Sequence, residues 1–452
     1  MAKRKAIKFG TDGIRGAANE ELTAEVSLAV GRGAAYHLSR NRRGTTGRVL
    51  VGKDTRISGD MIEAALVAGV ASIGVDAWRL GIIPTPGLAY MTRSLNCDCG
   101  IMISASHNPV EDNGLKIFSG EGYKLEDEDE AAIEQYMSGR GIEKASGAEV
   151  GRFVDKSKMG ANYTAHVRRR LRGVFIEGRI VVDCACGAAS RFAKRVFRNC
   201  AEEVIFINSD EDGLKINVDC GSTRPDKLAA RVLKHKAAFG FAFDGDADRV
   251  LFVDEKGCLV DGDQMMLMAA RNMIKEKKLP GNTIVSTVMS NMGLEYELGK
   301  LGGKMIRTPV GDKFVLREMR NGGFALGGEQ SGHVIFLDHG TTGDGMLTAA
   351  ELLNVFSKHE GVPFSRLTRM KRSAQFLKNI RVPDRDEYYD NRIIQKKVAE
   401  VEKRLGDEGR VVVRPSGTEP LIRVMVETWD REKAEAYTDE ILDTVRRELK
   451  VD

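Results

Sequence analysis

Residues 47–81 read GRVLVGKDTRISGDMIEAALVAGVASIGVDAWRLG, and this stretch decides the fold. It begins with a β-branched apolar run and a polar loop, continues with a helix-like segment that ends at a glycine, and closes with a second apolar run. A strand, a helix and a second strand in this order are typical of a βαβ crossover, which joins neighbouring parallel strands. The stretch therefore predicts an α/β domain with a largely parallel sheet.

Two later stretches repeat this plan at irregular separations. They are GRIVVDCACGAASRFAKRVFRNCAEEVIFIN at 178–208 and GNTIVSTVMSNMGLEYELGKLGGKMIRTPVGDKFV at 281–315. The irregular spacing argues against a solenoid and favours three similar α/β domains with mixed, largely parallel sheets. The C-terminal part differs, because two strand-like runs flank RPSGTEP and a closing helix follows Asp430, which is typical of an α+β module.

The length and composition of the chain agree with several soluble domains. We expect four within the 452 residues, at 1–155, 156–257, 258–370 and 371–452. A hydrophobic content of 42% and a charged content of 30% are ordinary for a soluble protein, and a net charge of +4 gives no support for a nucleic-acid partner. The basic start has no apolar segment after it and no later segment has the length of a membrane span, so we expect no secretory signal and no membrane contact.

The seven cysteines indicate a reducing compartment. They cannot all pair within one chain, and their spread does not resemble a disulfide framework. Two C-x-C pairs, Cys97/Cys99 and Cys184/Cys186, lack the wider spacing and the nearby histidines of a structural zinc site, so we interpret them as strand residues of one face. The chain is therefore predicted to be cytoplasmic.

The strongest chemical motif is DGDADR at 244–249, which follows the apolar run 239–243. Asp244, Asp246 and Asp248 repel one another unless protons or a cation neutralise them, and hard oxygen ligands suit Mg²⁺ or Ca²⁺. A calcium loop of the EF-hand type needs Gly at its sixth and Glu at its twelfth position, where this chain has Arg249 and Glu255. We therefore expect Mg²⁺; the alternative is an acidic turn at a strand end.

Two further loops have the chemistry to bind a phosphosugar. In RPSGTEPLIR at 414–423, forked guanidiniums, hydroxyls and a glycine suit a phosphate, and the alternative is a plain hairpin turn. In GGEQSGH at 327–333, side chains with donors and acceptors suit sugar hydroxyls or an amine, and the alternative is a surface turn. The residues concerned are Arg414, Ser416, Gly417, Thr418 and Arg423 in the first loop and Glu329, Gln330 and Ser331 in the second. His333, at the end of the second loop, is a candidate proton shuttle.

The motif ISASHNP at 103–109 supplies an exposed serine after a strand-like run. A dyad of Ser106 with His107 is awkward, because neighbouring side chains in an extended segment point to opposite faces. Together with a metal loop, a phosphate loop and a polyol-binding loop, Ser106 suits a carrier of a phosphoryl group, since phosphoryl transfer needs cations around the moving charge. Ser104 is the rival candidate, with a strand-end hydroxyl as its simpler interpretation.

Five motifs in this order, FGTDGIRG at 9–16 followed by ISASHNP, DGDADR, GGEQSGH and RPSGTEPLIR, make the whole chain resemble the α-D-phosphohexomutases. FGTDGIRG and Gln330 are similar to the bacterial branch of that family that acts on amino-sugar phosphates. The resemblance implies a four-domain, heart-shaped enzyme whose cleft is lined by one loop from each domain. One departure is Ala247, where many members of the family have glycine.

The resemblance also implies a role for each site residue. Ser106 is phosphorylated in the active form, and its phosphate completes a Mg²⁺ site with Asp244, Asp246 and Asp248. Arg15, His107 and Lys116 surround the phosphoserine, and Arg249 lies beside the metal loop. Glu329 and Ser331 bind the sugar, and His333 transfers a proton. The phosphate that is not being transferred is held by Arg414, Ser416, Gly417, Thr418 and Arg423.

The implied reaction is a phosphoryl relay on a small phosphosugar. Phosphorylated Ser106 converts a hexosamine phosphate into a hexosamine 1,6-bisphosphate, the intermediate and activator, which turns in the cleft and returns its other phosphate. A homodimer and a priming kinase or bisphosphate donor for Ser106 are the implied partners. The general base stays open between His333 and Lys116, which needs a lowered pKa for this role.

Three other functions fit the same motifs less well. Glucose or mannose phosphates could replace the amino sugar, since the chemistry is shared. A Mg²⁺-dependent phosphatase would transfer the phosphoryl group to water and would accumulate inorganic phosphate. A phosphosugar-binding module without catalysis would lack the aspartates or the serine, and this chain has both.

Overall fold

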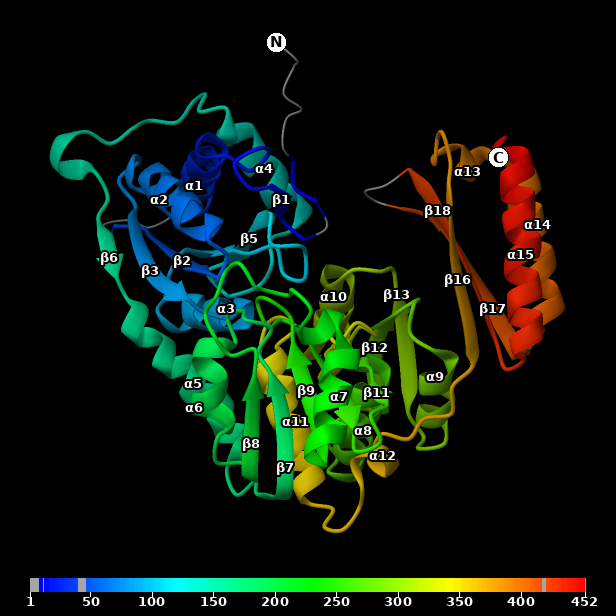
Figure 1. The fold of residues 1–452 in the computed structure, drawn as a ribbon. Helices are drawn as coiled ribbons and strands as arrows, with labels where there is room; N and C mark the ends of the chain where they lie inside the picture. Colours follow the sequence, from blue (N-terminus) through cyan, green and yellow to red (C-terminus); the bar gives the residue numbers. More distant parts are fainter. Residues whose placement is uncertain (1–7, 11, 40–45, 417–419, 452) are drawn as a thin grey trace.

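The computed structural model describes residues 8–10, 12–39, 46–416 and 420–451, which form four β-sheets with associated helices (Figure 1). The first three sheets are mixed and the fourth is antiparallel, so the expected three α/β domains and C-terminal α+β domain are confirmed. The C-terminal sheet and its helices stand at the right of Figure 1, beside the other three. Within the described residues, no helix combines the length and the apolar character needed to cross a bilayer.

The first sheet has the order β1-β5-β4-β2-β3-β6. The stretch 47–81 folds as β2-α2-β3, and β2 is parallel to both β3 and β4. Parallel strands that are covered on both faces contain continuous apolar runs, and β2 and β4 have such buried runs at 49–51 and 101–103. The strands are β1 (Ile14–Ala17), β2 (Arg48–Lys53), β3 (Asp76–Ile82), β4 (Cys99–Ile103), β5 (Asp112–Ser119) and β6 (Phe153–Asp155); the helices are α1 (Ala24–Leu38), α2 (Ser58–Ala71), α3 (Thr85–Ser94) and α4 (Asp127–Met137).

The second sheet has the order β11-β10-β9-β7-β8, and β9 and β10 form an antiparallel pair. In β9 the alternate residues Phe239, Phe241 and Phe243 are fully buried and pack into a cluster of aromatic rings. This packing fixes the end of β9, from which the acidic loop emerges. The strands are β7 (Ile176–Asp183), β8 (Ala201–Ile207), β9 (Phe239–Phe243), β10 (Val250–Asp254) and β11 (Leu259–Val260); the helices are α5 (Gly160–Arg168), α6 (Ser190–Phe197) and α7 (Pro225–His235).

The third sheet has the order β13-β12-β14-β15. The stretch 281–315 begins with β12-α9-β13, and the loop 329–333 joins β14 to β15. Asp261 and Gln264 form a capping box at the start of α8. The strands are β12 (Thr283–Thr287), β13 (Lys304–Thr308), β14 (Leu326–Gly328) and β15 (Val334–Phe336); the helices are α8 (Gly262–Lys275), α9 (Met292–Gly299), α10 (Asp312–Gly322), α11 (Gly345–Ser357) and α12 (Phe364–Leu367).

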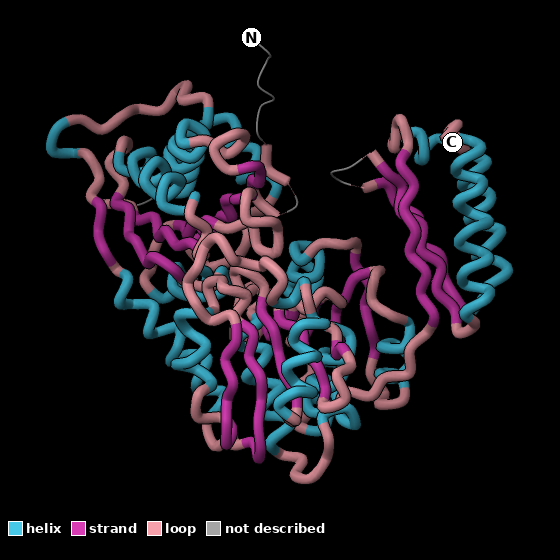
Figure 2. The backbone as a smooth tube through the Cα atoms, in the orientation of Figure 1, coloured by secondary structure: helices cyan, strands magenta, loops and turns pink. Residues whose placement is uncertain are grey.

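The fourth sheet, of order β16-β18-β17, is covered on one face by two long helices (Figure 2). The predicted antiparallel hairpin is confirmed, and so is Asp430 as the N-cap of the last helix, where it accepts hydrogen bonds from two backbone amides. The strands are β16 (Ala374–Arg381), β17 (Gly409–Pro415) and β18 (Leu421–Thr428); the helices are α13 (Glu387–Asp390), α14 (Arg392–Leu405) and α15 (Arg431–Glu448).

The hydrophobic core explains why the fourth domain is separate. One continuous cluster of buried side chains runs from Leu50 in the first domain through the phenylalanines of β9 to Phe364 in the third. The core of the fourth domain contains only residues from Ile380 onward. The fourth domain therefore has a core of its own.

The cysteines are only partly as expected. None of the seven forms a disulfide bond. Cys99 begins β4, but Cys97 precedes that strand, and Cys184 and Cys186 follow β7 in a loop. The interpretation of both C-x-C pairs as strand residues of one face was therefore wrong for three of the four, because each strand is shorter than its apolar run.

Candidate functional site

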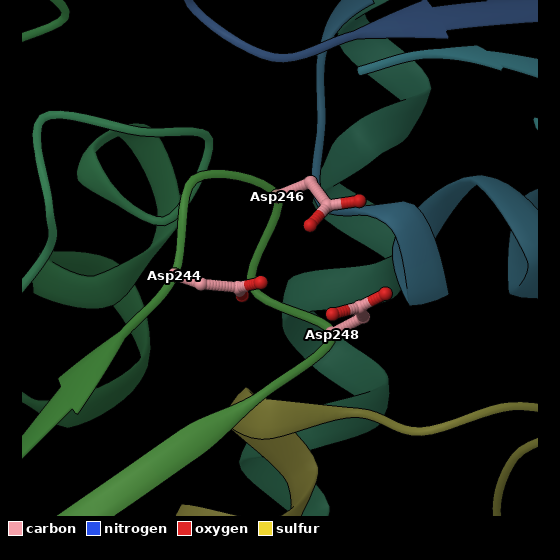
Figure 3. Close-up of side chains that lie close together, drawn as sticks. All are labelled: Asp244, Asp246 and Asp248. Atoms are coloured by element: carbon pink, nitrogen blue, oxygen red, sulfur yellow. The ribbon is translucent and has the colours of Figure 1, made fainter. Parts of the chain in front are cut away.

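The acidic triad occupies the turn between β9 and β10 (Figure 3). One carboxylate oxygen from each of Asp244, Asp246 and Asp248 lies within 4.8 Å of the others, and all three side chains are buried. Ala247, which lies between them, has a φ of 55°. This left-handed backbone conformation is less strained for glycine than for a residue with a Cβ atom. Within the described ranges, no other cluster of three His, Cys, Asp or Glu side chains could hold a metal ion.

The charges of the triad are only partly compensated by the protein. Lys116 Nζ lies 2.8 Å from Asp246 Oδ2 and 3.0 Å from Asp248 Oδ2, while Oδ1 of each aspartate is buried without a hydrogen-bond partner. Burial, followed by the charges of Asp248 and Asp246, raises the pKa of Asp244 well above its usual range. Buried oxygens without partners are costly, and a hard divalent cation would satisfy them. The residues present therefore fit such a cation.

Ser106 lies directly against the triad, although it comes from another domain. Its Oγ donates a hydrogen bond of 2.6 Å to Asp244 Oδ2, and only 1% of the residue is exposed. Its φ is 54°, so the segment is not extended, and His107 Nδ1 lies 3.3 Å from Ser106 Oγ. The expectation that the two side chains point to opposite faces was wrong, because it assumed an extended backbone. Ser106 is also buried in this structure, where the sequence suggested an exposed serine.

Ser104 has a different position and different partners. Its Oγ donates to Asp54 Oδ2 over 2.7 Å and accepts the backbone N–H of Ser106 over 2.9 Å. Both contacts support the turn that carries Ser106. The geometry therefore favours Ser106 over Ser104 as the residue that faces the triad.

Arg56 supports the same turn and was not indicated by any motif. Its Nη2 donates to the carbonyl oxygens of Ser106 and Asn108 over 3.1 and 2.8 Å, and its Nε donates to Asp54 over 3.1 Å. Asn217 Nδ2 also donates to the carbonyl of Ser106, over 2.9 Å. Arg56 follows β2 directly, and polar residues at the carboxyl ends of adjacent parallel strands meet at one sheet edge, so this position was a usable signal.

Lys116 is held as a cation. Burial opposes its charged form, but the carboxylates of Asp12, Asp246 and Asp248 raise the pKa of Lys116 well above its usual range. The same lysine, acting against the burial of Asp248, helps to lower the pKa of that carboxyl. A general base needs the opposite shift. In this arrangement Lys116 supplies positive charge next to Ser106 and the triad.

His107 and Arg15 complete the surroundings of the serine. Burial, then the charges of Arg249 and Arg15, lower the pKa of His107 to about 4, so its ring is neutral at physiological pH and able to accept a proton. Arg15 Nη1 donates to Asn108 Oδ1 over 2.9 Å, which connects β1 to the serine turn.

A cavity of about 660 Å³ brings three of the predicted loops together. Its wall contains residues from the metal loop, the β14–β15 loop and the C-terminal sheet; these are Arg249, Glu329, Gln330, Ser331, Arg414 and Arg423. A volume of this size suits a small ligand. The predicted sugar-binding and phosphate-binding residues therefore face one space.

Arg414 and Arg423 form a pair of like charges in the wall of this cavity. They lie directly opposite each other in the register of β17 and β18, and burial followed by the charge of Arg423 lowers the pKa of Arg414. Like charges in this position destabilise a sheet, and a bound anion relieves the repulsion. Ser416 is 3% exposed and its N–H donates to the carbonyl of Leu421, while Gly417 and Thr418 lie outside the described residues.

His333 lies behind the triad and not in the wall of the cavity. It is 2% exposed, its Nε2 accepts the backbone N–H of Gly343 over 3.0 Å, and its Nδ1 lies 3.9 Å from Asp248 Oδ1. Glu329 of the same loop does line the cavity. The structure therefore brings His333 to the metal loop and separates it from the sugar-binding side chains.

Asp263, in the first turn of α8, is a buried carboxyl group beside the sugar loop that no motif indicated. Its Oδ2 accepts hydrogen bonds from Gln330 Nε2 over 3.1 Å and from the backbone N–H of Asn291 over 2.8 Å. Burial, then the charge of Asp261, raises the pKa of Asp263 to about 7. This group therefore positions Gln330 and titrates near neutral pH.

Asp263→Asn should make the stability of the protein less dependent on pH. The folded chain keeps the proton of Asp263 up to about pH 7, whereas the unfolded chain loses it near the ordinary pKa of 3.8, so stability falls as the pH rises through this window. Asparagine keeps the acceptor oxygen without the charge. We expect the melting temperature of the Asp263→Asn variant to equal that of the wild type at pH 4 and to exceed it by roughly 5 °C at pH 8.

The control is Asp407→Asn, which changes an exposed carboxyl group after α14. It should alter the melting temperature little at either pH. If the melting temperatures of Asp263→Asn and the wild type differed by the same amount at pH 4 and at pH 8, the assigned titration of Asp263 would be wrong.

Comparison with known families covers nearly the whole chain. Models described as phosphoglucomutase/phosphomannomutase alpha/beta/alpha domain I, domain II and domain III match residues 6–141, 153–257 and 261–373, and the C-terminal domain of the same family matches 377–444. The phosphoglucosamine mutase of Carboxydothermus hydrogenoformans is 48% identical over 442 residues, which is 97% of this chain and 99% of that protein.

Two solved structures share the fold. A phosphoglucomutase/phosphomannomutase family protein from Burkholderia thailandensis superposes with a TM-score of 0.83 at 24% identity, over 99% of this chain and 98% of the other. The N-acetylphosphoglucosamine mutase of Aspergillus fumigatus, in complex with GlcNAc-6P and magnesium, has a TM-score of 0.70 at 20% identity, over 99% of this chain and 97% of the other. At these identities the likeness concerns the fold.

Proposed function

The chain belongs to the phosphoglucomutase/phosphomannomutase family of phosphohexomutases, and we propose that it interconverts glucosamine 6-phosphate and glucosamine 1-phosphate through a phosphorylated Ser106. The observation that carries the proposal is the hydrogen bond of 2.6 Å from Ser106 Oγ to Asp244, beside a cavity whose wall holds the sugar loop and the arginine pair. The amino sugar is supported by the curated relatives, which are phosphoglucosamine mutases at 45–48% identity.

In the first step the chain transfers a phosphoryl group from Ser106 to a sugar hydroxyl. The bond between phosphorus and Ser106 Oγ breaks, a bond from phosphorus to the sugar oxygen forms, and the hydroxyl proton passes to a base. Arg414 and Arg423 hold the other phosphate of the substrate, which keeps the attacking oxygen in line. Lys116 adds positive charge where negative charge develops.

In the return step Ser106 is the nucleophile towards the 1,6-bisphosphate. Two acceptors for its proton lie within reach, Asp244 Oδ2 at 2.6 Å and His107 Nδ1 at 3.3 Å. His333 lies behind the metal loop. The resemblance to the phosphohexomutases predicts that His333 carries a proton. Turning of the bisphosphate between the two steps lets one arginine pair serve either phosphate.

The proposed cofactors are Mg²⁺ and the hexosamine 1,6-bisphosphate. Asp244, Asp246, Asp248 and the phosphate of Ser106 would hold the metal ion, which supplies charge neutralisation for the transferred group. This assignment is supported by Oδ1 of Asp246 and Oδ1 of Asp248, which are buried without a hydrogen-bond partner.

We further propose that the domains 1–155, 156–257, 258–370 and 371–452 supply the phosphoserine, the metal site, the sugar site and the phosphate anchor respectively. The same proposal includes a homodimer and a priming kinase or bisphosphate donor for Ser106. A cytoplasmic location is supported by seven cysteines without a disulfide bond.

A ³¹P NMR time course with Mg²⁺ and a trace of hexose 1,6-bisphosphate tests the proposed reaction. Glucosamine 6-phosphate, glucose 6-phosphate and mannose 6-phosphate are offered in separate tubes, and fastest conversion of the amino sugar is expected. Faster turnover of glucose or mannose phosphate would keep the mechanism and overturn the substrate. Accumulation of inorganic phosphate alone would identify a phosphatase.

Arg423→Ala should weaken substrate binding without weakening the fold. Loss of a charged hydrogen-bonding partner for a phosphate is expected to raise KM roughly tenfold to a hundredfold, while the Mg²⁺ requirement stays unchanged. Steady-state kinetics over a range of substrate and Mg²⁺ concentrations measure both quantities.

The matched control is Arg381→Ala, on β16 of the same sheet and outside the wall of the cavity. It should leave KM unchanged. A change in the Mg²⁺ requirement of Arg423→Ala with an unchanged KM would show that the phosphate anchor is misplaced.

A further inference from the structure

A second cavity, of about 290 Å³, lies between α5 and α6 and is strongly basic. Its wall consists of Ala161, Thr164, Ala165 and Arg168 from α5, with Arg195 and Arg198 from α6 and the residue after it. It shares no residue with the wall of the catalytic cavity. In Figure 1 the two helices lie at the lower left, on the other side of the molecule from the C-terminal sheet.

The helical spacing explains how these residues converge. Positions 161, 164, 165 and 168 lie on one face of α5, and positions 195 and 198 lie on one face at the end of α6. The small side chains of α5 and the three arginines line this one space. The cavity is therefore built by two packed helices and not by a loose surface loop.

The three arginines have no compensating charge. Among the residues that the structure describes, no carboxylate forms an ion pair with Arg168, Arg195 or Arg198, whereas the neighbouring Arg170 and Arg191 each have such a partner. All three are exposed. Three guanidiniums around one small space repel one another and attract an anion.

We propose that this cavity binds a small molecule that carries two phosphate groups, through Arg168, Arg195 and Arg198. A single phosphate monoester carries a charge of about −1.5 to −2, so three fixed positive charges suit a ligand with two phosphates. No aromatic side chain lines the wall, so recognition is of the phosphates and not of a nucleobase. The proposal does not depend on the catalytic function.

Arginines near helix ends also interact favourably with the helix dipole. That role accounts for Arg168 in the last turn of α5 and for Arg195 in the last turn of α6, but not for their convergence with Arg198 on one cavity. The two roles differ in their consequences. Loss of the dipole interaction lowers the melting temperature, whereas loss of a ligand site lowers affinity for the anion.

Inorganic pyrophosphate is the probe, and binding is measured by titration calorimetry in buffer with EDTA. The full chain is used with Arg423→Ala in the background, so that the catalytic phosphate anchor contributes little. Arg195→Gln is compared with Arg172→Gln, an exposed arginine close in sequence that lies outside the cavity. We expect Arg195→Gln to weaken binding at least tenfold and Arg172→Gln to change it less than twofold.

The remaining readouts separate this site from the others. Without the background substitution, both variants should keep the kcat of the wild type, since neither residue lines the catalytic cavity. Equal weakening in both variants, no binding of pyrophosphate, or a lowered melting temperature of Arg195→Gln with unchanged binding would overturn the proposal. Flotation with vesicles of phosphatidylcholine and phosphatidic acid, if abolished by Arg195→Gln while pyrophosphate does not bind, would assign the cavity to a lipid headgroup and would also overturn it.

Discussion

Ser106→Ala is expected to lower kcat at least roughly a thousandfold, which corresponds to about 4 kcal/mol of activation free energy. The hydroxyl of Ser106 is the group proposed to carry the phosphoryl group, and alanine removes the only atom of this side chain that reaches Asp244. The fold should persist, because the turn is held by Arg56 and Asn217 through the backbone carbonyl of Ser106. Mass spectrometry of the intact chain after incubation with a hexose bisphosphate should show one phosphate on the wild type and none on the variant.

Ser104→Ala is the matched control for that experiment. Ser104 accepts the N–H of Ser106 and donates to Asp54, so its loss disturbs the turn without removing the carrier. We expect a reduced rate and retained phosphorylation. Near-normal turnover of Ser106→Ala together with loss of phosphorylation in Ser104→Ala would transfer the carrier role to Ser104.

Asp246→Asn is expected to lower kcat roughly a hundredfold and to raise the Mg²⁺ concentration needed for half-maximal activity. The substitution removes one of three negative charges and alters an oxygen that is buried without a partner, so it weakens the metal site and the charge stabilisation that the metal supplies. A Mg²⁺ titration of the initial rate measures both effects. Chelation of metal from the wild type should abolish turnover.

Asp254→Asn is the control, since Asp254 ends β10, the strand that follows the triad, and caps the next turn, between β10 and β11, by accepting the amides of Lys256 and Cys258. Asparagine retains an acceptor oxygen at that position, so the metal titration should be unchanged. If Asp246→Asn and Asp254→Asn gave the same Mg²⁺ titration as the wild type, the triad would not be the metal site.

The sequence predicted the classes of structure well, because they depend on local patterns. Apolar runs separated by a helix-like segment identified β2-α2-β3, β7-α6-β8 and β12-α9-β13, and turn residues identified the C-terminal hairpin. The three aspartates of DGDADR cluster by their spacing alone, since alternate residues of one tight turn lie close together. Such patterns determine contacts between residues that lie close together in the chain.

The catalytic arrangement needed contacts between distant residues. Ser106 and Asp244 are 138 positions apart, and their hydrogen bond exists because the first two domains share one core. The same packing gave Lys116 two of its three acidic neighbours, Asp246 and Asp248, and helped to raise its pKa, which its sequence position could not show. The third domain brings His333 to the metal loop, outside the wall of the cavity.

By itself, therefore, the sequence determined the α/β plan, the acidic turn, the C-terminal hairpin and the family. Only the tertiary structure decided which serine faces the triad, which arginine supports its turn, which charges Lys116 neutralises and where two helices leave three arginines without partners. The reason is physical. Secondary structure follows from the periodicity of neighbouring residues, whereas burial, charge compensation and cavities arise from the packing of segments far apart in the chain.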